Sequence, residues 1–212
     1  MGFDIEDYPG KYIVVEGPDF SGKDTQCRLL VEWLRQEGYD VFFMREPGTG
    51  HLGNKIREIL LNIKGEFLSA DAEMLLFMAN RAQIRDEYIL PALRRGQVVV
   101  SSRDRLSSRT YQGYGRGLSI EAIQSIGDYA MGGLRPNLYL VLLKELDSLL
   151  EWRSESLDRI EQEDKAFFER VWRGYRDFVD QNPDIAREIK AGRSVEEVHE
   201  SIKLEVGRLL LG

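Results

Sequence analysis

Residues 12–25 decide the fold: Tyr12-Ile13-Val14-Val15 leads through Glu16 into Gly17-Pro18-Asp19-Phe20-Ser21-Gly22-Lys23-Asp24-Thr25. The four apolar residues are typical of a buried strand, and Lys23 opens a helical pattern that runs to about residue 37. A glycine-bounded turn between a strand and a helix presents backbone N–H groups to a polyphosphate, and the lysine neutralises its outer oxygens. This stretch therefore predicts a nucleotide-binding loop.

One residue of the loop departs from the usual pattern. The residue after the lysine is ordinarily Ser or Thr, whose hydroxyl contacts Mg²⁺, and here it is Asp24. Two interpretations stay open. The carboxylate belongs to a rearranged metal site, or it only stabilises the helix N-terminus and repels the phosphates.

The rest of the chain alternates short apolar runs with helical patterns. Strands are predicted at 12–15, 41–44, 98–100, 138–143 and 185–189, and helices at 23–37, 51–63, 70–95, 120–131, 146–157, 162–181 and 195–210. The strands lack polar alternation, which is typical of a parallel sheet covered on both faces. We expect a three-layer α/β fold with a doubly wound, parallel five-stranded sheet and its ligand at the carboxyl ends of the strands.

Composition narrows the possible classes of protein. With 212 residues, 42% hydrophobic and 31% charged, the chain fits one domain (1–212) with a small lid at about 151–163. The net charge of −7 argues against a nucleic-acid partner. No apolar run approaches the length of a membrane span, and the acidic N-terminal residues are unlike a signal peptide. The single Cys27 is compatible with a reducing cytoplasm.

Six further blocks follow the loop in a fixed order. They are Arg45-Glu46-Pro47-Gly48-Thr49, the run 75–83, Ser102-Arg103, Tyr111-Gln112-Gly113, Arg135-Pro136-Asn137 and the run 157–163. From about residue 12 to residue 178 the chain thereby resembles the thymidylate kinase family, whose members phosphorylate dTMP with ATP. The resemblance implies a cytoplasmic homodimer with ATP and dTMP as substrates and Mg²⁺ as cofactor.

The resemblance implies an ATP site at residues 17–25, with Lys23 on the phosphates. Members of the family carry a mobile catalytic arginine in this loop or in the lid, and positions 18–21 hold no basic residue here. The chain is therefore similar to the lid type, with Arg153 and Arg159 closing over ATP. An ordinary surface ion pair between Arg153 and a neighbouring glutamate is the alternative.

The resemblance also implies a dTMP site, which consists of Asp19, Arg45, Phe77, Arg81, Arg103, Ser108, Tyr111 and Gln112. Arg45 and Arg103 would clamp the acceptor phosphate, as suits a planar guanidinium. Asp19 would accept from the sugar 3′-hydroxyl.

Phe77 would stack on thymine, with Arg81 one helical turn later contacting the base. Ser108 would read the thymine edge, and Tyr111 would exclude a ribose hydroxyl. Phe77 and Tyr111 could instead be plain packing aromatics. Glu46 is implied as a catalytic residue that holds the water shell of the metal or orients an arginine.

The family carries Asp-Arg at the end of the third strand, and two alignments compete for that pair. The ungapped alignment places Ser102-Arg103 there, whereas Asp104-Arg105 would leave the interval to Tyr111 two residues short. We prefer the first. Asp24 then stands where a hydroxyl belongs and Ser102 where a carboxylate belongs, so we expect a reciprocal exchange that keeps both oxygen ligands around Mg²⁺.

Two rival functions remain open at this stage. The chain could phosphorylate another pyrimidine monophosphate such as dUMP, or it could bind nucleotides as a regulatory protein without turnover, which Asp24 alone would support. The arginines at 94, 95, 105, 109 and 116 are expected on a solvated face.

Overall fold

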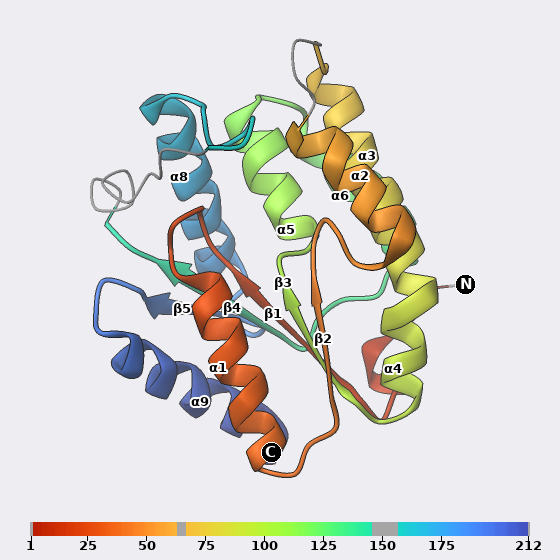
Figure 1. Ribbon diagram of the computed structural model, residues 1–212, viewed down its shortest axis with the longest axis vertical. Helices are drawn as coiled ribbons and strands as arrows, with labels where there is room; N and C mark the ends of the chain where they lie inside the picture. Colours follow the sequence, from red (N-terminus) through yellow and green to blue (C-terminus); the bar gives the residue numbers. More distant parts are fainter. Residues whose placement is uncertain (1, 63–66, 146–156, 212) are drawn as a thin grey trace.

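A five-stranded parallel sheet forms the centre of the computed structural model, which describes residues 2–62, 67–145 and 157–211 (Figure 1). The strands are β1 (Lys11–Glu16), β2 (Val41–Arg45), β3 (Val98–Ser102), β4 (Leu138–Leu143) and β5 (Ala186–Lys190), in the order β2-β3-β1-β4-β5. Within it, Val15 pairs with Ser102 on one side and Leu140 on the other. The expected parallel five-stranded sheet is confirmed.

Helices fill most of the intervals between strands. They are η1 (Ile5–Asp7), α1 (Lys23–Gln36), α2 (Gly50–Asn62), α3 (Ala70–Ile84), η2 (Arg85–Ile89), α4 (Leu90–Arg94), α5 (Arg105–Ser108), η3 (Arg109–Gly115), α6 (Ile120–Met131), α8 (Lys165–Gln181) and α9 (Val195–Leu211). The single helix predicted at 70–95 is three consecutive helical segments, with a π-helical turn before Pro91.

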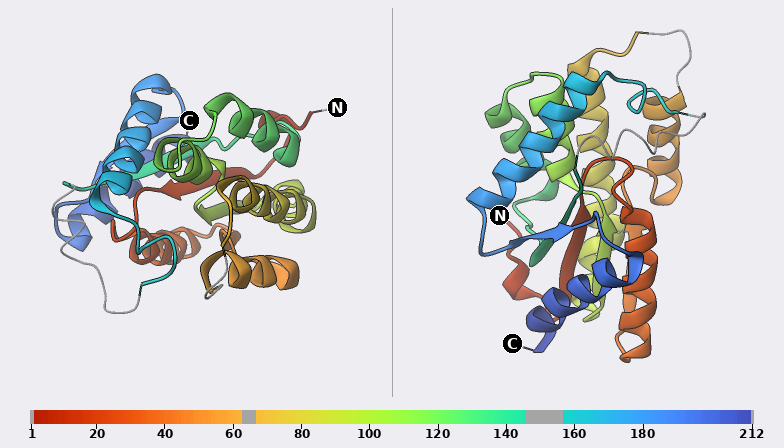
Figure 2. Two further views of the ribbon diagram at one scale, coloured as in Figure 1. Left: turned by 90° about the horizontal axis from the view of Figure 1, so that it is seen from above. Right: turned by 90° about the vertical axis from the view of Figure 1, so that its left-hand side faces the viewer.

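Both faces of the sheet are covered. α1 and α9 lie side by side on one face (Figures 1 and 2), where Leu30 and Ile202 pack against alternate strand residues such as Ile13 and Leu140. On the other face, Leu93 and Tyr175 pack with the remaining strand side chains, including Val14 and Val99. These two apolar layers explain why the strands show no polar alternation.

The segment between β3 and α6 differs from the prediction. Residues 105–115, for which no helix or strand was predicted, form α5 and the π-helical η3. Asp104 caps this stretch by accepting from the N–H of Leu106 at 2.7 Å. Nearer the C-terminus, α8 begins at Lys165 because Asp164 caps it, three residues later than predicted.

Most of the helix predicted at 146–157 lies outside the described residues, and 157–164 contains turns. None of the described helices combines the length and apolarity that crossing a membrane requires.

Candidate active site

A cavity of about 400 Å³ lies where β1, β2 and β3 end, as expected for this fold. Its walls come from four parts of the chain. They are Asp19, Phe20, Gly22, Lys23, Asp24 and Thr25 of the loop; Arg45, Glu46, Pro47, Arg57, Leu61 and Phe77; Ser102, Arg103, Ser107, Ser108, Tyr111 and Gln112; and Asp158, Ile160 and Glu161. Most of the predicted site residues therefore share one cavity.

The phosphate loop has the backbone that its glycines allow. Gly17 has a φ of 142°, and a Cβ there would lie 2.4 Å from the carbonyl oxygen of Leu142. Gly22 caps α1 with a φ of 88°. Lys23 lies buried at the start of that helix, and its Nζ donates to the carbonyl of Pro18 at 2.5 Å.

Burial, with Arg103 close by, lowers the pKa of Lys23 to about 8. The loop thus holds a buried ammonium group at the point where phosphate oxygens would bind.

Asp19, Arg103 and Tyr111 form the polar centre of the cavity. The Arg103 guanidinium is ion-paired with Asp19 and lies over the Tyr111 ring, 5.2 Å from its centroid. The Tyr111 hydroxyl donates to the Asp19 carboxylate at 2.7 Å and accepts from the Asp19 N–H at 3.0 Å. Although burial alone would raise the pKa of Asp19, Arg103 and Lys23 hold it below its ordinary value. The three residues therefore form one ion-paired and hydrogen-bonded group.

A second group of side chains fixes Arg103, whose φ of 74° is left-handed and unfavourable for a residue with a Cβ. Its Nη1 donates to Ser107 at 3.1 Å and to the Tyr175 hydroxyl at 3.4 Å. Tyr175 in turn donates to Glu16 at 2.8 Å. Burial and nearby Asp104 raise the pKa of Glu16. A buried hydrogen-bond network that includes Tyr175 on α8 therefore stabilises the left-handed conformation of Arg103.

Glu46 binds Arg81, as one of its two expected roles required. The Arg81 Nε donates to Glu46 at 2.8 Å, and its other nitrogens donate to Ser108 at 2.8 Å and to the Asp104 carbonyl at 2.6 Å. Burial raises the pKa of Glu46 to about 8, against the effect of Arg81. Arg81 is only 1% exposed and is not among the residues that line the cavity; it donates to Ser108 and lies over the Phe77 ring, 5.6 Å from its centroid.

Gln112 and Arg159 meet at Glu73, a buried carboxylate on α3 that the sequence did not single out. The Gln112 amide donates to Glu73 at 2.7 Å, and both Arg116 and Arg159 are ion-paired with it. Arg159 also donates to the carbonyl of Leu60 at 3.0 Å and does not line the cavity. The structure therefore does not bring Arg159 to the phosphate loop, and Arg153 lies outside the described residues.

Asp24 and Ser102 are neighbours at the wall of the cavity. The Ser102 hydroxyl donates to the Asp24 carboxylate at 3.5 Å, across the ends of β3 and α1. A carboxylate and a hydroxyl group thus lie beside Lys23 in the wall of the cavity.

Several lining residues were not predicted. Arg57 on α2 donates to the carbonyl of Pro47 at 2.9 Å, and burial lowers its pKa. Asp158 and Glu161 reach the cavity from the described part of the predicted lid, which begins at residue 157. The run 157–163 contains Asp158 and Glu161, whereas Arg57 lies outside the quoted blocks, and only their position in space shows that the three share the site.

Comparisons with known proteins agree with this geometry. The family model described as thymidylate kinase matches residues 15–202. A thymidylate kinase of Exiguobacterium sp. is 42% identical over 195 residues, which cover 91% of this chain and 92% of that protein. One of Pelotomaculum thermopropionicum is 45% identical, covering 90% and 89%, and one of Caldanaerobacter subterraneus is 39% identical, covering 96% and 98%. The chain belongs to the thymidylate kinase family.

Proposed function

We propose that this chain transfers the γ-phosphoryl group of ATP to dTMP and releases dTDP and ADP. The observation that carries the proposal is the convergence of Lys23 with the group Asp19, Arg103 and Tyr111 in one cavity. A phosphate loop alone would indicate nucleotide binding. Arg103 beside Asp19 adds a cation for an acceptor phosphate and a carboxylate for the sugar of the acceptor nucleotide.

The residues fit a reaction that depends on positioning and charge. The acceptor phosphate is already largely ionised near neutral pH, so Lys23 and Arg103 need only neutralise and align the reacting oxygens. Asp19 is held ionised by Arg103 and can accept from a sugar hydroxyl. Tyr111 fixes that carboxylate and packs against the sugar side of the cavity.

Product identification tests this proposal. Incubation with ATP, Mg²⁺ and dTMP should give the two ³¹P resonances of dTDP together with ADP, in equal amounts. ADP with free phosphate would indicate ATP hydrolysis. Nucleotide binding with no new resonance would favour the regulatory alternative over a kinase.

We also propose Mg²⁺ as the cofactor, with Asp24 and Ser102 as its protein ligands. The Asp24 carboxylate is exposed to the cavity, and its hydrogen bond runs to Ser102 and not to the helix end. Mg²⁺ usually takes one or two protein oxygens and completes its shell with water and phosphate. When bound, the ion would offset phosphate charge next to Lys23.

A double-mutant cycle tests the exchange. Asp24→Ser and Ser102→Asp should each weaken Mn²⁺ binding, measured by electron paramagnetic resonance in the presence of ADP, about 10-fold or more. The double variant restores one carboxylate and one hydroxyl, so it should recover most of the loss. Additive losses would show that the two positions do not share the metal.

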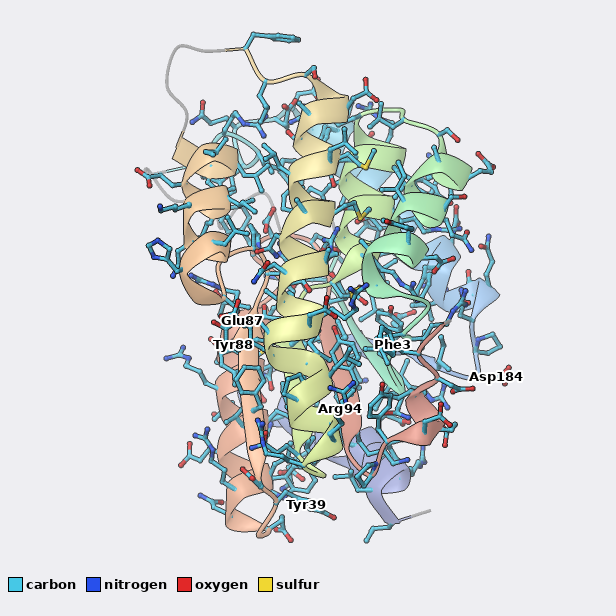
Figure 3. The ribbon with its side chains drawn as sticks, turned by 90° about the vertical axis from the view of Figure 1, so that its right-hand side faces the viewer. Phe3, Tyr39, Glu87, Tyr88, Arg94 and Asp184 are labelled. Atoms are coloured by element: carbon cyan, nitrogen blue, oxygen red, sulfur yellow. The ribbon has the colours of Figure 1, made fainter. Side chains whose placement is uncertain are left out.

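The family resemblance leads us to propose a cytoplasmic homodimer, and one face of the molecule supports self-association. α3 runs between α2 and α6 on this face (Figure 3). These three helices carry exposed apolar side chains, namely Leu52 and Ile59 on α2, Leu75 on α3 and Tyr129 on α6. Leu75→Glu should convert the dimer to a monomer in sedimentation equilibrium, whereas Leu204→Glu on α9 should not.

A further inference from the structure

A second cavity, of about 280 Å³, adjoins the helical segment α5–η3. Arg105, Leu106 and Arg109 of this segment line it, whereas Ser108 and Tyr111 of the same segment line the candidate active site. The two cavities share no lining residue. One helical segment therefore separates two binding-sized spaces.

The walls of this second cavity combine an apolar surface with cationic groups. Ile120 and Ile123 on α6 and Phe178 on α8 supply apolar side chains. Three arginines line the same space, at positions 105, 109 and 135, and their lone acidic companion in the lining is Asp128. Such a lining fits a ligand with an apolar body and a negative charge.

Asp128 neutralises only part of this positive charge. It is 2.5 Å from Arg105 and 3.8 Å from Arg135, which is 56% exposed. Arg109 contacts the neutral amide oxygen of Gln181 at 3.1 Å instead. The sequence placed Arg105 on a solvated face, but its side chain is only 16% exposed and helps to build this cavity.

Arg109 also carries an unpaired donor. Its Nε is buried and has no hydrogen-bond partner within the described ranges 2–62, 67–145 and 157–211. Buried N–H groups of this kind are ordinarily satisfied, so this guanidinium N–H lacks a partner that an ordered water or a bound group would supply.

We propose that this second cavity binds a small organic anion, in which a phosphate or carboxylate group is attached to an apolar ring. Arg109 and Arg135 bind the charged group, since a guanidinium matches both anions. The ring packs between Ile123 and Phe178. The proposal concerns a site separate from the reaction centre and does not depend on the kinase assignment.

The wall of the cavity is connected to the reaction centre by hydrogen bonds. Tyr139 lines the cavity and donates to the Asp104 carboxylate at 2.7 Å. The Asp104 N–H donates to Glu16 at 2.9 Å, and its carbonyl accepts from Arg81 at 2.6 Å. A ligand of the second cavity that shifts Tyr139 or α5 therefore changes the affinity of the protein for dTMP. By reciprocity, bound dTMP changes the affinity for that ligand by the same factor.

Titration of the ¹⁵N-labelled full-length protein with phenyl phosphate tests the proposal, with dTMP and ADP saturating the active site. Chemical shifts should move at residues 105–109 and 120–128. Benzoate should move the same signals if a carboxylate suffices, whereas benzyl alcohol, which has no charge, should bind at least 10-fold more weakly.

Arg109→Gln should weaken phenyl phosphate binding at least 10-fold. Gln124→Glu, which adds a negative charge at an exposed position of the wall, should do so without disturbing the core. Arg94→Gln, at an exposed site on α4 labelled in Figure 3, should leave binding unchanged. No shift at residues 105–109 and 120–128 while dTMP and ADP saturate the active site, or equal affinity in the first two variants and wild type, would overturn the proposal.

Discussion

Arg103 is the residue on which the candidate site depends most. Its guanidinium contacts Asp19, Ser107 and the Tyr175 hydroxyl at once, from a left-handed backbone conformation. The ammonium group of a lysine, a compact charge on a flexible side chain, cannot make these three directed contacts at once. The left-handed backbone of Arg103 therefore directs one planar cation at the Asp19 carboxylate and into the cavity.

Arg103→Lys keeps the charge and the backbone strain but removes the guanidinium fork. We expect kcat/KM for dTMP to fall about 100-fold, or about 3 kcal/mol, with a much smaller change in KM for ATP. Arg95→Lys, at an exposed position, is the matched control. A loss below about threefold in steady-state kinetics would show that the fork has no part in acceptor binding.

The lowered pKa of Lys23 gives the reaction a pH limit. The ammonium group is charged below its pKa of about 8, and only that form neutralises phosphate. In the free enzyme, kcat/KM for ATP should therefore decline as pH rises through about 8. Saturating ATP should move the decline in kcat upward, because bound phosphates favour the charged form. A profile of kcat/KM that stays flat to pH 10 would be inconsistent with this role.

At this scale the sequence predicted the chemistry of the site better than its detailed contacts. Asp19, Tyr111 and Ser108 all line the cavity, as did most of the loop. Arg81 and Arg159 were expected to face the ligands, but both are bound to buried carboxylates. A motif identifies a guanidinium near a site, yet its direction depends on partners such as Glu73 that lie far away in the sequence.

The segment α5–η3 is the element that the sequence concealed. Three glycines within or beside residues 109–117 and few apolar residues obscured its helical period. The detectable signal was Asp104, an N-cap residue two positions before Leu106. Because Ser108 and Tyr111 lie on this helical segment and not on a loop, their positions are set by its packing against α8.

Glu73 joins three parts of the chain, namely α3, the end of η3 and the described part of the predicted lid. Its carboxylate is 1% exposed and binds Gln112, Arg116 and Arg159. Glu73→Gln keeps the shape but leaves two arginines without their shared counter-charge, so the free energy of unfolding should fall by about 3 kcal/mol.

Urea unfolding measures this loss of stability as a lower midpoint concentration, with an m-value equal to that of wild type. Glu87→Gln, at an exposed site on η2 (Figure 3), should leave the midpoint near that of wild type. An equal midpoint for Glu73→Gln would show that Glu73 is not a structural junction.

For the whole molecule, the alternation of apolar runs and helical patterns was sufficient to predict the layers. The order β2-β3-β1-β4-β5 places the loop after β1 next to the ends of β3 and β4, which is why residues 17–25 and 102–112 meet. The spacing of apolar residues in the sequence cannot predict the second cavity. Arg105 and Phe178 come together only when α8 packs on the face of the sheet that carries Val14 and Val99.

The most direct test of the account compares kcat/KM for dTMP, dUMP, UMP, CMP and AMP with the wild-type protein, ATP and Mg²⁺. The account predicts the highest value for dTMP and a marked loss for ribonucleotides, because we propose that the sugar binds beside Tyr111 and Asp19, which are hydrogen-bonded in the wall of the cavity. Equal values for the five acceptors, or no turnover with any of them despite ATP binding, would contradict it.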